Sequence, residues 1–180
     1  MIAIMSVSLV DRLRELGGTL ETLRPGDYLF RLDEPVAALF LVEEGEVHLT
    51  RHQEEGGVVI LQRAGPGDIP AEASFFSERY HCDAIAGPAS VVRRIPIARL
   101  RALFRSDPDF AELWGRRLAN QIQDTRLRNE ILSLRTVAAR LDGWLAWHGD
   151  LPPKGEWKWL AHQLGVSPEA LYREIASRRD

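Results

Sequence analysis

The feature that most constrains this chain is its last stretch, residues 156–179, EWKWLAHQLGVSPEALYREIASRR. This stretch reads as two short helices joined by a tight turn. The first helix has one apolar face, formed by Leu160, Ala161 and Leu164. We expect that helix to end at Gly165, because glycine adopts a left-handed backbone at little cost. Val166 is then expected to point into a small core.

The second helix of this stretch begins with strong local signals. The hydroxyl of Ser167 can cap it, and Pro168 suits the first helical position, where a missing N–H costs nothing. Leu171 and Ile175 are four residues apart, so they share the face that packs on the first helix. The pattern indicates a helix-turn-helix, whose second helix enters the major groove of DNA, although an ordinary helical hairpin is the alternative. The predicted DNA-binding residues are Ser167, Pro168, Glu169, Ala170, Tyr172, Arg173 and Ser177.

Composition narrows the setting of the protein. A single cysteine, Cys82, excludes an internal disulfide and fits a reducing cytoplasm. The sequence contains no run of about 18 apolar residues, so it predicts no membrane span. The N-terminal residues lack the basic region of a signal peptide. Charge is uneven: residues 1–92 carry 7 basic and 15 acidic side chains, whereas residues 93–135 carry 10 and 5. The basic block suits phosphates or an acidic neighbour, or else is a solvated helix surface.

The middle of the chain has the pattern of a β domain. A first helix is expected over residues 6–16, with Val7, Val10, Leu13 and Leu16 at helical spacing. Between residues 20 and 96, short apolar runs alternate with glycine and proline turns. Many short strands at such spacing predict an antiparallel sandwich or jelly roll.

One group of side chains in this β region raises the question of a metal. On a strand Glu46, His48, His52 and Glu54 would share one face. A cupin-like metal enzyme would use such a cluster, but its close His-x-His pair is absent, so a solvated face is the better interpretation. Nothing in the sequence indicates a catalytic triad or an acid–base pair. We therefore expect no catalytic residues, no metal, no cofactor and no enzyme activity.

Helical periodicity returns at residue 97, and a long helix is expected over residues 109–134 after a break at Asp107 and Pro108. Spacings of four and three residues predict a coiled-coil seam between two copies, although a single helix lying on the β domain is the alternative. The seam begins with Ala111 and Gly115 and continues through Leu118, Ile122, Thr125, Asn129 and Leu132. A further helix starts at residue 135. Its expected core residues are Val137, Leu141, Trp144, Leu145 and Trp147.

The order of β roll, long helix and helix-turn-helix resembles the CRP/FNR family of bacterial transcription regulators over nearly the whole chain. The matching stretches are RPGDYLFRLDEPVAALFLVEEGEVHL, GPGDIPAEASFF and LAHQLGVSPEALYREIA. The resemblance implies an α+β protein with three parts: a cyclic-nucleotide-binding-like jelly roll over residues 1–106, a dimerisation helix over residues 107–135 and a helix-turn-helix domain over residues 136–180. It also implies a cytoplasmic homodimer on a two-fold symmetric DNA site, with RNA polymerase as a further candidate partner and an unknown small-molecule effector.

The sensor segment departs from the family pattern. Family members that bind cyclic nucleotides carry a Gly-Glu stretch for the ribose, then an arginine and a Ser or Thr for the phosphate. Glu72 matches the glutamate, but Ala71 replaces the glycine, and His81 and Cys82 occupy the phosphate positions. Asp83 follows and adds negative charge. The effector-pocket residues implied by the resemblance are Glu72, Ala73, Ser74, His81, Cys82 and Gln121.

The DNA-binding segment also departs from the pattern. Glu169 and Arg173 match the family's glutamate and second arginine, which suit cytosine and guanine or phosphate. The first arginine of the recognition helix is missing. The family's β-hairpin wing should follow residue 179, and the printed sequence ends at residue 180. Either a shortened chain or a naturally reduced protein would explain that.

The sequence therefore predicts a homodimeric, DNA-binding transcription regulator whose roll senses an effector other than a cyclic nucleotide. The alternative is a haem- or redox-sensing member of the same family that uses His81 or Cys82.

Overall fold

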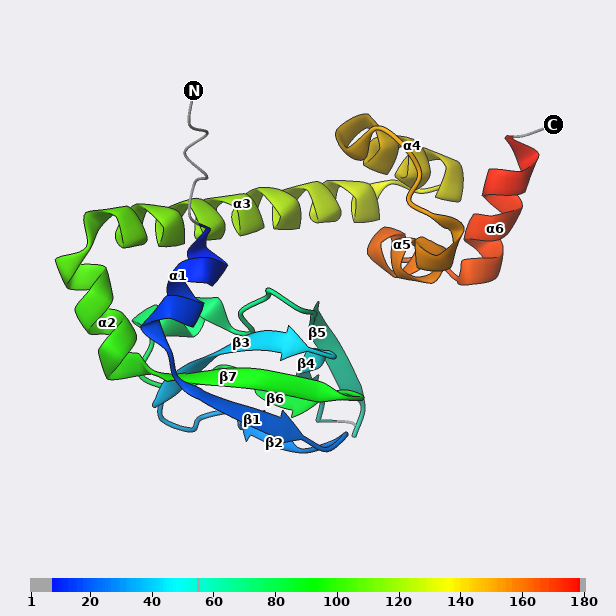
Figure 1. Ribbon diagram of the computed structural model, residues 1–180. Coiled ribbons are helices and arrows are strands. Elements are labelled where there is room, and N and C mark those ends of the chain that lie inside the picture. Colours follow the sequence, from blue (N-terminus) through cyan, green and yellow to red (C-terminus); the bar gives the residue numbers. More distant parts are fainter. Residues whose placement is uncertain (1–7, 55, 179–180) are drawn as a thin grey trace, which may run out of the picture. The chain divides into compact units, whose positions relative to one another are not determined.

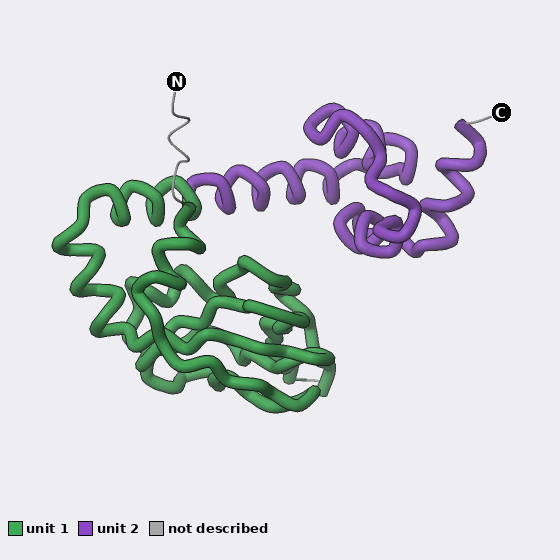
Figure 2. Tube along the Cα trace, viewed as in Figure 1, with its two compact units in different colours: residues 1–118 green, residues 119–180 purple. Residues whose placement is uncertain are grey.

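The computed structural model describes residues 8–54 and 56–178. The chain divides into two compact units, residues 1–118 and 119–180 (Figure 2). The division falls inside one long helix, α3 (Pro108–Ser133), so the first half of α3 belongs to the first unit and the second half to the second (Figure 1).

The first unit is built on the predicted antiparallel roll, which the structure confirms. One sheet has the strand order β1-β7-β3 and the other β2-β6-β4-β5. All strand pairs are antiparallel. The strands are β1 (Thr19–Leu23), β2 (Tyr28–Phe30), β3 (Ala38–Glu44), β4 (Val47–His52), β5 (Val58–Ala64), β6 (Asp83–Ala86) and β7 (Ser90–Pro96). Side chains from both sheets share one core, which includes Leu39, Leu41, Val47, Leu49, Ala84 and Val92.

The turn between β3 and β4 needs glycine. Gly45 has a φ of 71°, and a Cβ there would lie 2.4 Å from the carbonyl oxygen of Ala89. Any other residue would therefore both strain the backbone and collide with a neighbouring loop. This close contact fixes where β4 begins.

The face predicted for Glu46, His48, His52 and Glu54 is only partly present. The pairing of β4 with β5 shifts register between Leu49 and Thr50. Thr50 is consequently buried, although simple alternation would place it on the same face as the two histidines. Glu54 lies beyond the end of β4, so the regular alternation that the prediction assumed does not hold.

Three helices pack against the roll through one face each. Leu9 and Leu13 of α1 (Leu9–Leu16), Leu100 of α2 (Ile97–Ser106), and Phe110 and Trp114 of α3 all join its core. The predicted first helix was expected from residue 6, whereas α1 begins at Leu9. Val7 of its predicted face lies outside the described residues.

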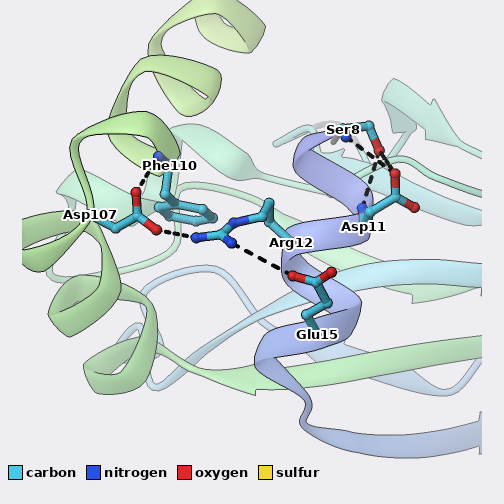
Figure 3. Close-up of polar contacts among 6 residues, drawn as sticks. All are labelled: Ser8, Asp11, Arg12, Glu15, Asp107 and Phe110. Atoms are coloured by element: carbon cyan, nitrogen blue, oxygen red, sulfur yellow. Dashed lines mark hydrogen bonds and ion pairs between the residues drawn. The ribbon is translucent and has the colours of Figure 1, made fainter. Parts of the chain in front are cut away.

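Polar contacts tie α1 to the start of α3 (Figure 3). Ser8 and Asp11 form a reciprocal capping box at the beginning of α1. Arg12 is hydrogen-bonded to the carboxylate of Asp107, and the other oxygen of that carboxylate accepts from the amide of Phe110 at 3.0 Å. Asp107, expected as a break, therefore caps α3.

A second set of contacts ties α1 to the roll. The Glu43 carboxylate accepts hydrogen bonds from the side chains of Arg14, at 2.9 Å, and Arg93, at 2.7 Å. Burial by itself raises the pKa of Glu43, but these two hydrogen bonds and the charges behind them outweigh it and lower the pKa below its ordinary value.

The second unit is a small helical domain. It combines the end of α3 with α4 (Val137–His148), a short 3₁₀ turn η2 (Lys154–Glu156), α5 (Trp157–Leu164) and α6 (Pro168–Ser177). The core contains Leu127, Ile131, Leu141, Trp144, Trp157, Leu160, Ala161, Leu164, Leu171 and Ile175. The expectation that Trp147 belongs to this core is wrong, because its side chain is 64% exposed. Instead, His148 stacks on Trp144.

In the described ranges, no helix is long and apolar enough to cross a membrane.

Candidate functional site

The turn between α5 and α6 has the geometry that the sequence signals require. Gly165 adopts the left-handed conformation, with φ 62° and ψ 38°. Its N–H bonds back into the last turn of α5, and the Val166 N–H bonds to the Ala161 carbonyl at 3.0 Å. Ser167 then caps α6 by accepting from the Ala170 amide at 3.2 Å. Leu171 and Ile175 are buried, so α6 is held through one face only.

Several predicted DNA-binding residues lie on the outer part of α6. Ser167, Glu169, Tyr172, Arg173 and Ser177 are exposed, while Pro168 and Ala170 are half-buried. In the described part of the chain, Arg173 has no hydrogen-bond or ion-pair partner. The pKa of Glu169 is lowered, chiefly by its own backbone N–H and then by Ser167, which favours the charged form. One free cation and one anion are thus placed on the same exposed helix.

Arg140, which sequence reasoning did not single out, holds the turn in place. Its guanidinium donates to the carbonyls of Leu164 and Gly165, each at 3.0 Å, and of Leu132 and Leu134, at 3.1 and 2.8 Å. One side chain of α4 therefore binds the C-terminal ends of both α3 and α5, where carbonyl groups lack helical partners and carry partial negative charge.

Arg178 anchors the other end of α6. Its guanidinium bonds to Asp142 and to the Ala138 carbonyl of α4, as well as to Glu174. The second helix of the pair is consequently fixed at its start by the Gly165 turn and at its end by an ion pair. Both ends of α6 are therefore fixed on the unit, and the Arg173 side chain is exposed.

The sensor segment of the roll is a short 3₁₀ helix, η1 (Glu72–Phe76). Ala71 precedes it in the left-handed conformation, with a φ of 55°. Glu72 and Ser74 are buried, whereas Ala73 is exposed. The hydroxyl of Ser74 has no hydrogen-bond partner among the described residues. The segment thus turns polar groups toward the interior of the roll.

The same segment is packed on the helices that follow the roll. Phe75 contacts Trp114 of α3 at a ring distance of 4.9 Å and Phe104 of α2 at 5.1 Å. Arg101 of α2 donates to the carbonyls of Phe75 and Ser77, each at 3.2 Å. A shift of η1 would therefore be felt directly by α2 and by the first half of α3.

Comparisons with known proteins identify relatives of the roll and of the whole fold. Residues 20–107 match the family model described as "Cyclic nucleotide-binding domain". The chain is 25% identical over 137 residues, 76% of its length, to the transcriptional activator protein Anr of Pseudomonas aeruginosa, and it spans 56% of the length of that relative.

Two solved structures share the fold. The sensor domain of the transcriptional regulator DNR from Pseudomonas aeruginosa is 26% identical, with a TM-score of 0.52, over 66% of this chain and 77% of that one. FixK2 from Bradyrhizobium japonicum is 18% identical, with a TM-score of 0.63, over 88% of this chain and 83% of that one. The chain has the fold of CRP/FNR-type regulators, as the sequence predicts.

Within the matched residues 20–107, the two residues at the predicted phosphate positions have different environments. His81 is exposed, while Cys82 is buried. Burial raises the pKa of the Cys82 thiol, Arg51 opposes this, and Asp83 and Glu72 add to it. These charges act on Cys82 because the four side chains lie near one another. The Asp83 carboxylate itself is buried and accepts from the Leu32 amide at 2.8 Å.

Arg51 is the cation that sequence reasoning missed. It lies on β4 and donates to the carbonyl oxygen of His81 at 2.7 Å. No family signal marks it, because it comes from a strand thirty residues earlier. Arg79, two residues before His81, is hydrogen-bonded to the Asp33 carbonyl. Gln121, the remaining predicted pocket residue, is half-buried on the part of α3 in the second unit.

The predicted seam residues on α3 fall into two groups. Ile122, Thr125 and Asn129 are exposed, with Ile122 at 52%. Leu118 packs against the core of the first unit. Leu132 lies at the Gly165 turn: a Cβ atom added to Gly165 would lie 2.5 Å from the Cδ2 atom of Leu132. The side chains at the centre of the predicted seam are therefore exposed, whereas Leu118 and Leu132 pack against other parts of the same chain.

The histidines of the roll form no metal-binding group. His48 lies 3.0 Å from Glu46, and His52 lies 3.8 Å from Asp83. Across residues 8–54 and 56–178, no three His, Cys, Asp or Glu side chains come close enough together to hold a metal ion. The two histidines thus have different carboxylate neighbours.

Proposed function

We propose that this protein is a DNA-binding transcription regulator, a cytoplasmic homodimer whose cyclic nucleotide-binding domain responds to an effector other than a cyclic nucleotide. The observation that carries the proposal is the α5–α6 pair, with its glycine turn, its capped second helix and its outward Arg173. An ordinary helical hairpin does not require a second helix that is fixed at both ends and carries an exposed arginine with no ion-pair partner among the described residues.

The chemistry of α6 suits the major groove. Arg173 can donate two hydrogen bonds to guanine, and Glu169 can accept from the amino group of cytosine. Both side chains are exposed, and the pKa of Glu169 is lowered, so the residue is charged at neutral pH. The amides at the start of α6 would position the helix on phosphates.

A two-fold partner follows from the same proposal, because a helix-turn-helix reads paired half-sites. The open centre of the seam on α3 supports α3 as the dimerisation helix. Ile122 in particular is a large exposed apolar residue on a stretch of helix that is otherwise mostly polar. We assign no catalytic role to the protein.

The proposed effector class rests on the charges of the sensor segment. A cyclic nucleotide carries a full negative charge, and burying it needs a cation or several well-aimed donors. The family position for that cation is occupied by the exposed His81, and the buried carboxylate of Asp83 is near. Haem or redox sensing through His81 and Cys82 is less favoured, because one side chain is exposed, the other is buried, and the pKa of the buried thiol is raised.

The test of DNA binding is selection from random duplex DNA, followed by binding measurements on the enriched site. We expect a two-fold symmetric sequence. Arg173→Gln should weaken binding to it by about 1–3 kcal/mol, whereas the matched loss of an exposed arginine on α2, Arg105→Gln, should not. Recovery of no enriched sequence would refute the proposal.

The effector is tested by calorimetry with cyclic AMP and cyclic GMP at millimolar concentration, which should show no saturable heat at neutral pH. Micromolar binding would overturn the proposed effector class while leaving the DNA-binding proposal intact. Mass spectrometry of the intact purified protein would identify a retained small molecule, and an absorption band in the Soret region would favour the haem alternative.

A further inference from the structure

The second unit contains a cavity that is separate from the residues assigned to DNA and to the seam. Its volume is about 310 Å³, at the small end of the range of ligand pockets. It lies where the end of α3 meets α4 and α5. Besides two aliphatic side chains of α3, it is lined by Asp124, Arg128, Trp144, His148, Trp159 and Gln163.

Arg128 is the residue that gives this cavity a charge preference. Its side chain is half-buried, and its Nε atom is fully buried with no hydrogen-bond partner among the residues that the structure describes. In the described part of the chain it forms no ion pair. The two other half-buried or anchored arginines of this unit, Arg140 and Arg178, use several donors each. A guanidinium left unpaired beside an open cavity favours an anionic ligand, and its fork matches a carboxylate.

The walls of the cavity favour a flat ring. Trp144 is buried and stacks on His148, with ring centroids 4.0 Å apart and planes 5° apart. Trp159 is 48% exposed, which is unusual for tryptophan on a short helix of a packed domain. Two indole side chains thus line one cavity from α4 and α5, and such surfaces bind planar aromatic groups.

The remaining polar side chains limit where the ligand can place its own donors. The Nδ1 atom of His148 lies 2.9 Å from the Trp144 carbonyl oxygen. That oxygen only accepts, so Nδ1 carries the hydrogen, and Nε2 of the neutral ring is an acceptor. Asp124 is one helical turn before Arg128 and exposed, so water screens its charge, and it too accepts.

We propose that this cavity binds a small planar aromatic carboxylate: the carboxylate pairs with Arg128, and the ring lies against Trp144 and Trp159. A ring N–H or amino group is accommodated by the acceptors Asp124 and His148. Gln163 can serve as donor or acceptor.

The cavity remains compatible with the proposed dimer. If the seam residues occupy the a and d positions of a heptad, Asp124 and Ile131 fall at c, Leu127 at f and Arg128 at g. The α3 residues that line the cavity therefore lie largely outside the seam. A ligand here would contact α3, α4 and α5 together. It would therefore stabilise the packing of these three helices.

The test is calorimetric titration of the whole chain with indole-3-acetate, beside its neutral analogue indole-3-acetamide. For a ligand of this size we expect a Kd of roughly 0.1–1 mM for the acid, and binding at least about tenfold weaker for the amide, because the charged hydrogen bonds are lost. Arg128→Gln should lower the affinity for the acid to that for the amide and leave the affinity for the amide unchanged. Trp159→Leu should weaken both.

Matched controls are available on the same elements. Arg126→Gln removes an exposed arginine of α3, and Trp147→Leu removes an exposed tryptophan of α4, and neither residue lines the cavity. Both should leave binding of the acid unchanged. An unchanged amide affinity in Arg128→Gln also shows that the variant is folded. No saturable heat with the acid, equal effects of Arg126→Gln and Arg128→Gln, or no effect of Arg128→Gln would each overturn the proposal.

Discussion

The contact with the largest predicted effect on the second unit is the Arg140 guanidinium. Replacing it with methionine keeps an unbranched apolar stem but removes four hydrogen bonds to main-chain carbonyls, at 2.8 to 3.1 Å. A hydrogen bond to a charged group contributes about 1.5–3 kcal/mol. The four share one charge and are half-exposed, so water replaces part of them, and we expect a loss of about 2–4 kcal/mol in the free energy of unfolding.

Tryptophan fluorescence in urea measures this loss where it occurs. Four of the five tryptophans, Trp144, Trp147, Trp157 and Trp159, belong to the second unit, so the signal reports mainly on that unit. Arg140→Lys keeps the charge, but one ammonium cannot reach carbonyls at two helix ends in the same geometry, and we expect an intermediate loss.

Arg135→Met is the control for this experiment, because Arg135 is an exposed arginine just beyond α3. A surface substitution of this kind changes stability by less than about 0.5 kcal/mol. If Arg140→Met and Arg135→Met unfold at the same urea concentration, the inference that Arg140 joins the ends of α3 and α5 is refuted.

Three further predictions concern the seam, the α1 contacts and the thiol. Ile122→Asp should give monomers in size exclusion with light scattering, because the dimer would bury one aspartate from each copy in the seam, which is costly. The neighbouring Gln123→Asp should stay dimeric. A dimeric Ile122→Asp would disprove the seam. The pKa of Glu43 is lowered in the folded state, so the stability it gives is present above its ordinary pKa and is lost as pH falls through the lowered one. Thermal melting of Glu43→Gln should therefore differ from the parent at pH 7 and converge with it in acid, and a constant difference would contradict this. Cys82 is buried with a raised pKa, so a thiol reagent at pH 7.5 should modify it at least about 100-fold more slowly in the native protein than in denaturant; equal rates would show that the thiol is accessible.

The parts of the fold that depend on local chemistry could be predicted from the sequence. The α5–α6 turn rests on Gly165, Ser167 and two apolar residues four apart, and each acts within a few residues of its place in the chain. The roll was likewise predicted from turn glycines such as Gly45. Such signals are local, so a single sequence carries them in full.

The errors occur where distant parts of the chain decide the outcome. Trp147 looks apolar and periodic, yet its place over Trp144 is taken by His148, whose ring stacks there. The strand face of His48 was predicted from regular alternation, and the register shift at Thr50 comes from the pairing with β5. Arg140 gave no signal, because its four acceptors come from α3 and α5 and a sequence does not show which carbonyls a helix end leaves unpaired.

The sensor segment illustrates how such distant contacts bear on function. The sequence shows a missing arginine at position 81, and that alone suggests a site with no cation. The structure adds Arg51 from β4, but its guanidinium is engaged by the His81 carbonyl, and the nearby carboxylate of Asp83 by the Leu32 amide. Charges in this region are therefore satisfied by the protein itself. An anionic effector would have to displace these contacts before gaining its own. An uncharged effector could use the buried Ser74 hydroxyl, which has no hydrogen-bond partner in the described part of the chain, without disturbing them.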